Sequence, residues 1–399
     1  MRKRDFILFL LASALLGISQ SIDNSFINNF FNDTFHLSVT QRTMLEIPRE
    51  FPGFAVVFVS TILFFLGDVR LAALANVLAA FGMFGLGYFS SGMGLMVAWL
   101  LLYSLGQHLF IPLSNSIAMS LADEGNMGKR LGQINAANTL AFLLANLSFA
   151  LIFKVVAVNY RVVFLVGALA FFAASLLILK MTPHSPQNVH KGFKILIRKE
   201  YRLFYGLNVL FGARKQIFIT FAPWVLIQVF NQGVSTFALL GFIIAGISIF
   251  FKPFVGYLID KYGERFVLAG EAFCLIFVCL GYAFSQRFFI GIGHGEFTIY
   301  LISACFVFDQ MIMAAGMARA TYLKKIALNS EDVSPTLSMG TTVDHVLSMI
   351  VPWIGGFIWT RFGYEYVFLG GAIIACFNLL ATSRIQIPKH DSVSRSLAQ

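Results

Sequence analysis

The stretch Gly256–Arg265 reads GYLIDKYGER and joins two long apolar runs of the chain, 234–258 and 265–286. Gly256 and Gly263 are expected to allow close backbone approach and a positive φ. Asp260 is expected to accept hydrogen bonds from a helix N-terminus or from Arg265. The stretch therefore predicts a tight, charged turn between two long helices.

The composition places the chain in a lipid bilayer. Hydrophobic residues make up 58% of the 399 residues and charged residues 12%, and 45 residues are Phe. Soluble domains do not have this composition. A hydrocarbon core requires about 20 apolar residues per helix, and about twelve such runs occur: 6–31, 47–66, 71–90, 94–120, 131–157, 160–180, 201–229, 234–258, 265–286, 297–320, 337–360 and 364–384. Backbone groups in lipid must be satisfied within a segment, so we predict an all-α polytopic membrane protein with twelve transmembrane helices.

The distribution of Lys and Arg predicts the orientation. The side that would hold both termini and the segment 181–200 receives most of the basic residues. The other side receives only Arg42, Arg49, Lys154, Arg161, Arg287 and Arg361. By the positive-inside rule both termini are expected in the cytoplasm, in a plasma (inner) membrane. The net charge of +10 is then explained by the orientation of the protein in the membrane and by contact with anionic lipid headgroups. No nucleic-acid partner is expected.

The polar stretch 181–200 divides the chain into two related halves. We expect an N-terminal six-helix half at 1–180, a cytoplasmic linker at 181–200, a C-terminal six-helix half at 201–386 and a cytoplasmic tail at 387–399. The sequence NYRVVFLVGA from Asn159 echoes GYEYVFLGGA from Gly363. Asp68 stands in the first half where Asp260 stands in the second. Duplicated six-helix units are typical of secondary transporters.

The pattern G-x-L-x-D-K-x-G-x-R at 256–265 closely resembles the signature loop of the major facilitator superfamily of secondary transporters. The resemblance implies the major facilitator fold and alternating access, in which the two halves rock about a small-molecule site near the midplane. It also implies that the first, fourth, seventh and tenth helices line the cavity. Gly256, Asp260, Gly263 and Arg265, with Asp68 in a degenerate first-half loop, are then expected to bias the conformational equilibrium.

Polar residues at bilayer depth are costly and so indicate function. In the first helix Asp23 lies beside a stripe on one helical face that contains Ser13, Gly17, Gln20, Asn24 and Asn28. Such a stripe is either a helix-packing seam or a cavity lining, and we favour the cavity. We place Asp23, Asn24 and Asn28 in the substrate site, together with Asn138 of the fifth helix.

The seventh helix carries Arg214 and Lys215 about 20 Å from its start. One of them could bind an anionic group of the substrate, while the other pairs with Asp309 or snorkels outward. A purely structural salt bridge is the alternative. Both cations are assigned to the substrate site.

The fourth and tenth helices carry Gln107-His108 and Asp309-Gln310 at matching places. We also place Gln107 and Gln310 in the substrate site. His108 is a candidate proton carrier because an imidazole has an ordinary pKa of about 6.5, although it could instead be a hydrogen-bonded packing residue. Asp309 is the second candidate, and Asp344 of the eleventh helix, which aligns with Asn138 in the repeat, is the third.

Three further groups have simpler interpretations. Glu46, Arg49 and Glu50 open the second helix as an extracellular gate or as an ion-pair cap, and Arg319 is interpreted as a cytoplasmic anchor. Four cysteines lie in apolar segments without metal-binding spacing, so we expect packing residues and no metal site: Cys274, Cys279, Cys305 and Cys376.

No nucleotide, dinucleotide, nucleophile or zinc motif occurs in a plausible context. The chain is therefore not expected to be an enzyme or to need a cofactor. We predict a monomeric secondary active transporter of a small polar, anionic organic solute, coupled to protons. The alternatives are an exporter of hydrophobic or cationic compounds, a lysolipid transporter and a non-transporting receptor.

Overall fold

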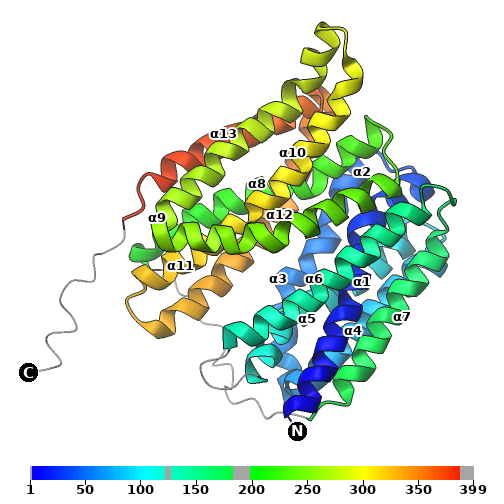
Figure 1. Cartoon of the computed structure of the whole chain (residues 1–399), viewed down its shortest axis with the longest axis vertical. Helices are drawn as coiled ribbons and strands as arrows, with labels where there is room; N and C mark the ends of the chain where they lie inside the picture. Colours follow the sequence, from blue (N-terminus) through cyan, green and yellow to red (C-terminus); the bar gives the residue numbers. More distant parts are fainter. Residues whose placement is uncertain (1, 122–126, 183–197, 387–399) are drawn as a thin grey trace, which may run out of the picture.

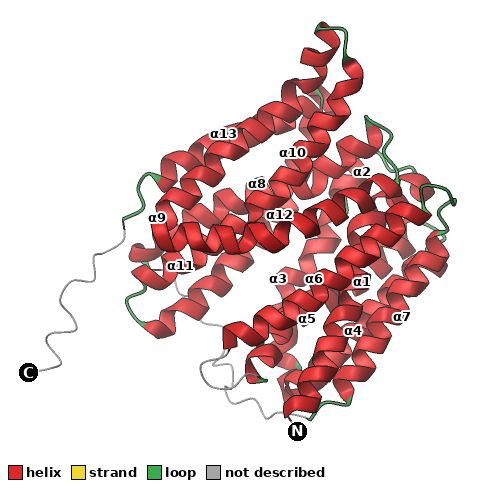
Figure 2. Ribbon diagram, in the orientation of Figure 1, coloured by secondary structure: helices red, strands yellow, loops and turns green. Residues whose placement is uncertain are grey.

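The structure is a computed structural model that describes residues 2–121, 127–182 and 198–386 (Figure 1). These residues form helices with short connections and no strand, as Figure 2 shows. The predicted all-α fold class is confirmed. The middle of the predicted linker, 183–197, and the predicted tail, 387–399, lie outside the described residues.

The helices form two groups that lie side by side in Figure 1. The first, here called the N half, comprises α1 (Arg2–Phe35), α2 (Val39–Met44), α3 (Glu46–Ile62), η1 (Phe64–Leu66), α4 (Gly67–Tyr88), α5 (Met93–Ser120), α6 (Met127–Ile152) and α7 (Tyr160–Leu179). The second, the C half, comprises η2 (Lys199–Tyr201), α8 (Arg202–Gln228), α9 (Val234–Gly291), η3 (Gly295–Phe297), α10 (Thr298–Ile312), η4 (Met313–Gly316), α11 (Met317–Ile326), α12 (Ser330–Phe362) and α13 (Tyr364–Thr382).

Each half is held together by its own helix contacts. In the N half α1 packs against α6 and α7, and α4 packs against α5 and α7. In the C half α8 packs against α12 and α13, and α9 packs against α10 and α13. The halves meet where α6 packs on α9 and where α2 and α3 pack on α12. We call the end of the bundle where α1 begins the terminal end, and the end where α1 stops the far end.

The turn predicted at 256–265 divides the longest helix. α9 has 58 residues, but Gly263 within it has φ 83° and ψ 168°, a region that essentially only glycine adopts. Two helices therefore meet at Gly263, which confirms its predicted positive φ. The expectation for Gly256 is wrong, since this residue is helical and a Cβ there would touch nothing. Asp260 is exposed and makes no hydrogen bond with Arg265 or any other described residue.

The described helices are consistent with the twelve predicted spans. Ten of them are long and apolar enough to cross a membrane. One of these ten is α9, which Gly263 divides into two helices. A further helix, α3, has 17 residues and lies at the place of the predicted run 47–66. The predicted run 297–320 is not one regular helix, because the 3₁₀ turn η4 separates α10 from α11.

The corresponding loop of the N half also contains a glycine with a positive φ. Gly67 has φ 71° at the start of α4. The next residue, Asp68, accepts a hydrogen bond of 2.5 Å from the Ser116 hydroxyl of α5. Asp68 is thus fixed to the adjacent helix, whereas its counterpart Asp260 points into open space.

We expect Gly263→Ala to lower the free energy of unfolding by about 1–3 kcal/mol, because Ala strongly disfavours this backbone conformation. The matched control is Gly256→Ala, which removes a helical glycine in open space and should be neutral or stabilising by up to about 1 kcal/mol. Thermal unfolding of the two purified variants in detergent measures both effects. Equal destabilisation by the two substitutions would contradict the role given to Gly263.

Candidate functional site

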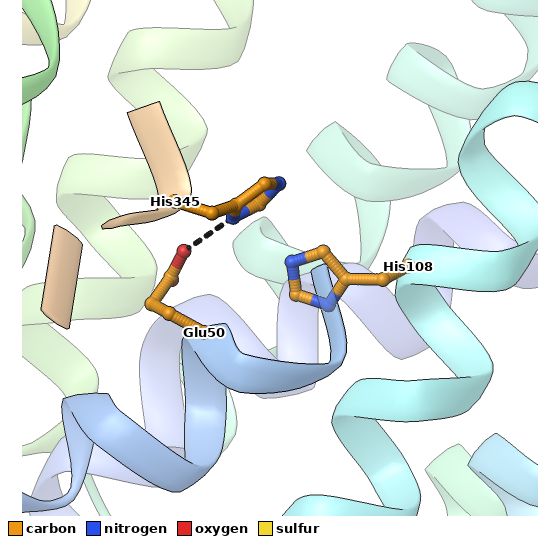
Figure 3. Close-up of side chains that lie close together, drawn as sticks. All are labelled: Glu50, His108 and His345. Carbon is orange, nitrogen blue, oxygen red and sulfur yellow. Dashed lines mark hydrogen bonds and ion pairs between the residues drawn. The ribbon is translucent and has the colours of Figure 1, made fainter. Parts of the chain in front are cut away.

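Titratable side chains of the two halves meet near the middle of the helices. We call Glu50 of α3, His108 of α5, Lys215 of α8, and Asp344 and His345 of α12 the central cluster. Lys215 Nζ lies 2.5 Å from Asp344 Oδ2, and His345 Nδ1 donates to Glu50 Oε2 at 2.9 Å across the two halves (Figure 3). The side chains of Lys215 and Asp344 are 14% and 18% exposed, so this pair is only partly buried.

The two histidine rings lie against each other at this junction. Their centroids are 5.0 Å apart, with an angle of 71° between the planes. His108 Nδ1 lies 2.9 Å from the Ser104 carbonyl oxygen one turn earlier on α5. A carbonyl oxygen only accepts, so Nδ1 carries the proton. Gly53 of α3 leaves room for both rings, because a Cβ there would overlap His345 and His108.

A second group, the far cluster, surrounds Glu46 on the far-end side. Arg42 Nη1 lies 2.6 Å from Glu46 Oε1, and Arg42 Nε donates to Asn28 Oδ1 at 3.0 Å. Gln216 of α8 donates to Glu46 Oε2 at 3.0 Å, which adds a second hydrogen bond between the halves. Arg49 lies 3.4 Å from the same carboxylate. Glu46 thus accepts from both halves, as either a gate or an ion-pair cap would.

The first helix contributes Asp23 to this region. Its carboxylate lies near Tyr103, Gln107 and Arg49. Gln107 in turn donates to the Tyr103 hydroxyl at 2.6 Å. The positions predicted on the first and fourth helices therefore converge, whereas Tyr103 was not predicted.

Arg42 and Arg49 were assigned to the far side, and the structure places both side chains against Glu46. The side chain of Arg42 is 1% exposed and that of Arg49 is 24% exposed. Both guanidinium groups point to Glu46 instead of the membrane surface. A count of basic residues by loop cannot distinguish such inward-facing cations.

A buried network of four charged side chains lies within the C half. Arg214 Nη1 is 3.1 Å from Asp309 Oδ1 and Arg214 Nη2 is 3.3 Å from Glu271 Oε1. Arg319 Nη1 is 3.5 Å from Glu271 Oε2. Phe211 lies under Arg319, whose guanidinium carbon is 3.4 Å from the ring centroid. Two cations and two carboxylates balance each other, as burial at this depth requires.

The network changes two predictions. The predicted Arg214–Asp309 pair is present, but the side chain of Arg214 is 1% exposed, so its charge is committed to its own half. Of the two adjacent cations, Lys215 is therefore the one that reaches the central cluster. Arg319, predicted as a cytoplasmic anchor, is buried and paired with Glu271; that prediction is wrong.

The remaining predicted residues separate into packing and exposed positions. Asn138 donates to the Ser13 carbonyl at 3.1 Å, and Gly17 lies against the backbone of Asn138. This part of the polar stripe is a seam between α1 and α6. Asn24 is exposed, and Gln310 donates to Asp309 Oδ2 at 3.3 Å.

Besides Tyr103, sequence reasoning missed Glu271, and it did not find the partner of His345. Glu271 stands alone in the apolar run 265–286, and a single carboxylate at bilayer depth was the signal that could have found it. His345 is adjacent to the predicted Asp344, but its pairing with Glu50 joins residues far apart in the chain. In the described residues, Glu50, His108 and His345 are also the group whose ligand atoms lie close enough to hold a metal ion.

The chain resembles known proteins in its fold and in its sequence profile. No curated protein matches the sequence. Among solved structures, a mutant of the nucleoside transporter NupG has a TM-score of 0.75 at 14% identity, covering 96% of this chain and 99% of that one. A bacterial homolog of the human lysosomal transporter Spinster and a D-xylose–proton symporter each have a TM-score of 0.71 at 15% identity, covering 96% of this chain and 97% of theirs. At these identities the likeness concerns the fold.

The sequence profile of the Major Facilitator Superfamily matches residues 9–329. This match includes the N half from residue 9 onward, the turn at Gly263 and the charged network of the C half. The chain belongs to the Major Facilitator Superfamily.

Proposed function

We propose that this chain is a secondary active transporter that binds a small polar solute between its two halves, at the central cluster. The observation that carries the proposal is the meeting of titratable side chains from both halves: the partly exposed Lys215–Asp344 pair belongs to the C half, and the Glu50–His345 hydrogen bond joins the two halves. Family membership supports the transporter class. Among the structural neighbours, one is a nucleoside transporter and another couples D-xylose to protons.

An acidic group on the solute is favoured by the available cations. Lys215 of the C half and Arg49 of the N half are 14% and 24% exposed, and both act on the carboxylate of Glu50. Asp344, the partner of Lys215, has a second oxygen, Oδ1, without a hydrogen bond. A solute carboxylate or phosphate could replace Asp344 at Lys215, because the two anions would compete for one ammonium group.

The contacts between the halves support alternating access. Near the far end Gln228 donates to Asn32, and Ser235 donates to the Ala150 carbonyl at 2.9 Å. The other two hydrogen bonds between the halves end on Glu46 and Glu50. Among the described residues, none joins the halves nearer to the terminal end. The solute site would therefore be closed toward the far end and would open toward it when these contacts separate.

Proton coupling is assigned to Asp309. Its carboxylate is buried in the middle of the tenth span, beside the 3₁₀ turn η4. Arg214 has a second carboxylate, Glu271, within 3.3 Å. Protonation of Asp309 would therefore leave Arg214 paired while it loosens one contact between α8 and α10, which is a route from a proton to helix motion.

Lys215→Gln is expected to weaken binding of acidic solutes at least tenfold while leaving neutral solutes unaffected, because a charge-assisted contact is lost. The measurement is a thermal-shift screen of purified full-length protein against organic acids, sugar phosphates, nucleosides, sugars, organic cations and lysolipids. The matched control is Lys325→Gln, which removes the cation of the pair with Glu264. Stabilisation by organic cations or lysolipids alone would instead favour the exporter or lysolipid alternatives.

Asp309→Asn is expected to abolish accumulation of the solute driven by a proton gradient, while exchange of labelled for unlabelled solute continues. Proteoliposomes loaded with the solute found by the screen measure both activities. Exchange shows that the variant is folded and cycles, so it separates loss of coupling from loss of structure. Wild-type accumulation and pH dependence in this variant would show that Asp309 is only structural, and an absence of exchange in the wild type would favour a receptor.

The orientation follows from the basic residues and is proposed with the terminal end in the cytoplasm. In a background without the four native cysteines, Gly92→Cys in the far-end loop should react with an impermeant maleimide on intact cells. Ser383→Cys at the end of α13 should react only after permeabilisation. Labelling of both from the same side would contradict the proposed topology.

A further inference from the structure

We infer that Glu50, His108 and His345 form a binding site for a divalent transition-metal ion of the zinc class that bridges the two halves. One ligand atom from each residue lies within 4.8 Å of the other two. Glu50 and His108 come from α3 and α5 of the N half, and His345 comes from α12 of the C half. The inference concerns these three side chains and does not depend on which solute the protein carries.

The donor set fits this class of ion. Zinc binds imidazole nitrogen and carboxylate oxygen at about 2.0–2.2 Å, so two ligands of a tetrahedral site are roughly 3.4 Å apart. His345 Nδ1 and Glu50 Oε2 are already 2.9 Å apart, and the remaining separations need to close by at most roughly 1.4 Å. Calcium and magnesium prefer oxygen ligands alone. A fourth position remains for water or for an acidic group of a solute.

His108 is oriented as a metal ligand would be. Its Nδ1–H is held by the Ser104 carbonyl at 2.9 Å, which leaves the lone pair on Nε2. Figure 3 shows this far nitrogen of the ring pointing toward His345. Metal-binding histidines commonly donate their other N–H to a backbone carbonyl, which fixes both tautomer and ring orientation. Ser104 is fixed in turn, because its hydroxyl donates to the Arg49 carbonyl.

Charge balance also favours a cation here. Arg49 and Lys215 act on Glu50 only from a distance, because the carboxylates in ion-pair contact with them are those of Glu46 and Asp344. Glu50 is 9% exposed, and its hydrogen-bond partner is an imidazole. A carboxylate this far from water needs a cation or a proton. A metal ion would replace the proton that His345 now donates to Glu50, and that proton would move to Nε2 of the same ring.

The position of the site couples the ion to conformation. The third ligand moves with α12, so separation of α12 from α3 would remove it from the other two. A bound ion therefore stabilises the state in which the halves are in contact at this level, and it opposes opening toward the far end. Ligand binding to one of two states shifts their populations by its differential affinity.

The test uses purified full-length protein in detergent, stripped with a chelator and titrated with zinc chloride by calorimetry. We expect one ion per chain in the wild type. His108→Gln and His345→Gln should each weaken binding at least tenfold. His294→Gln is the control, since His294 is 58% exposed in a surface pair with Glu296, and it should bind zinc as the wild type does. No binding at about 100 µM zinc, or equal binding by wild type and both variants, would overturn the inference.

Lys215→Gln provides a second measurement that loss of structure cannot imitate. The substitution removes a cation that acts on Glu50, so zinc should bind at least about threefold more tightly as repulsion falls. A folding defect would weaken binding instead. Unchanged or weaker zinc affinity in this variant would contradict the site, whatever the screen for acidic solutes shows.

Discussion

An ionisable side chain away from water must find its partner within the protein, and this constraint shapes the C half. The side chains of Arg214, Glu271 and Asp309 are at most 1% exposed, and that of Arg319 is 7% exposed. They come from α8, from the part of α9 after Gly263, from α10 and from α11. Removing one partner of a buried pair costs about 3–5 kcal/mol. Relative movement among these helices would break such pairs, so the network favours movement of the C half as a unit while Asp309 is ionised.

The N half reaches a similar rigidity by close packing of small residues. Gly82 of α4 lies against the backbone of Tyr103, and Gly106 of α5 lies against the backbone of Ala75 and Ala79. Ser13 and Asn138 join α1 to α6 by a hydrogen bond. Small residues let helix backbones approach closely, which is how helices associate where lipid removes the hydrophobic driving force. The two halves are thus stabilised by different interactions.

The sequence was sufficient for the architecture and for part of the site. Hydropathy located the spans because a bilayer imposes a minimum length on every helix, and the charged turn was found because Gly263 occupies a conformation that other residues avoid. Pairings such as Glu50 with His345 could not be predicted, since they depend on how two helix bundles face each other. The same limit explains the error at Arg319. Position along a helix indicates depth in the membrane, but not whether a side chain faces lipid or a carboxylate.

The contacts between the halves differ in kind from those within them. Four hydrogen bonds cross the interface among the described residues, and they involve amide, hydroxyl or imidazole donors. Each contributes about 0.5–1.5 kcal/mol, or about 1.5–3 kcal/mol where a carboxylate accepts. Water can replace these contacts when the halves part, whereas the side chains of the Arg214 network are at most 7% exposed. Separation at the interface is therefore the least costly large movement, and one of the four contacts that it breaks, Glu50–His345, lies in the central cluster. Glu50 and His345 combine a cross-half contact with the capacity to bind a cation, so a ligand there acts directly on the equilibrium between the two states.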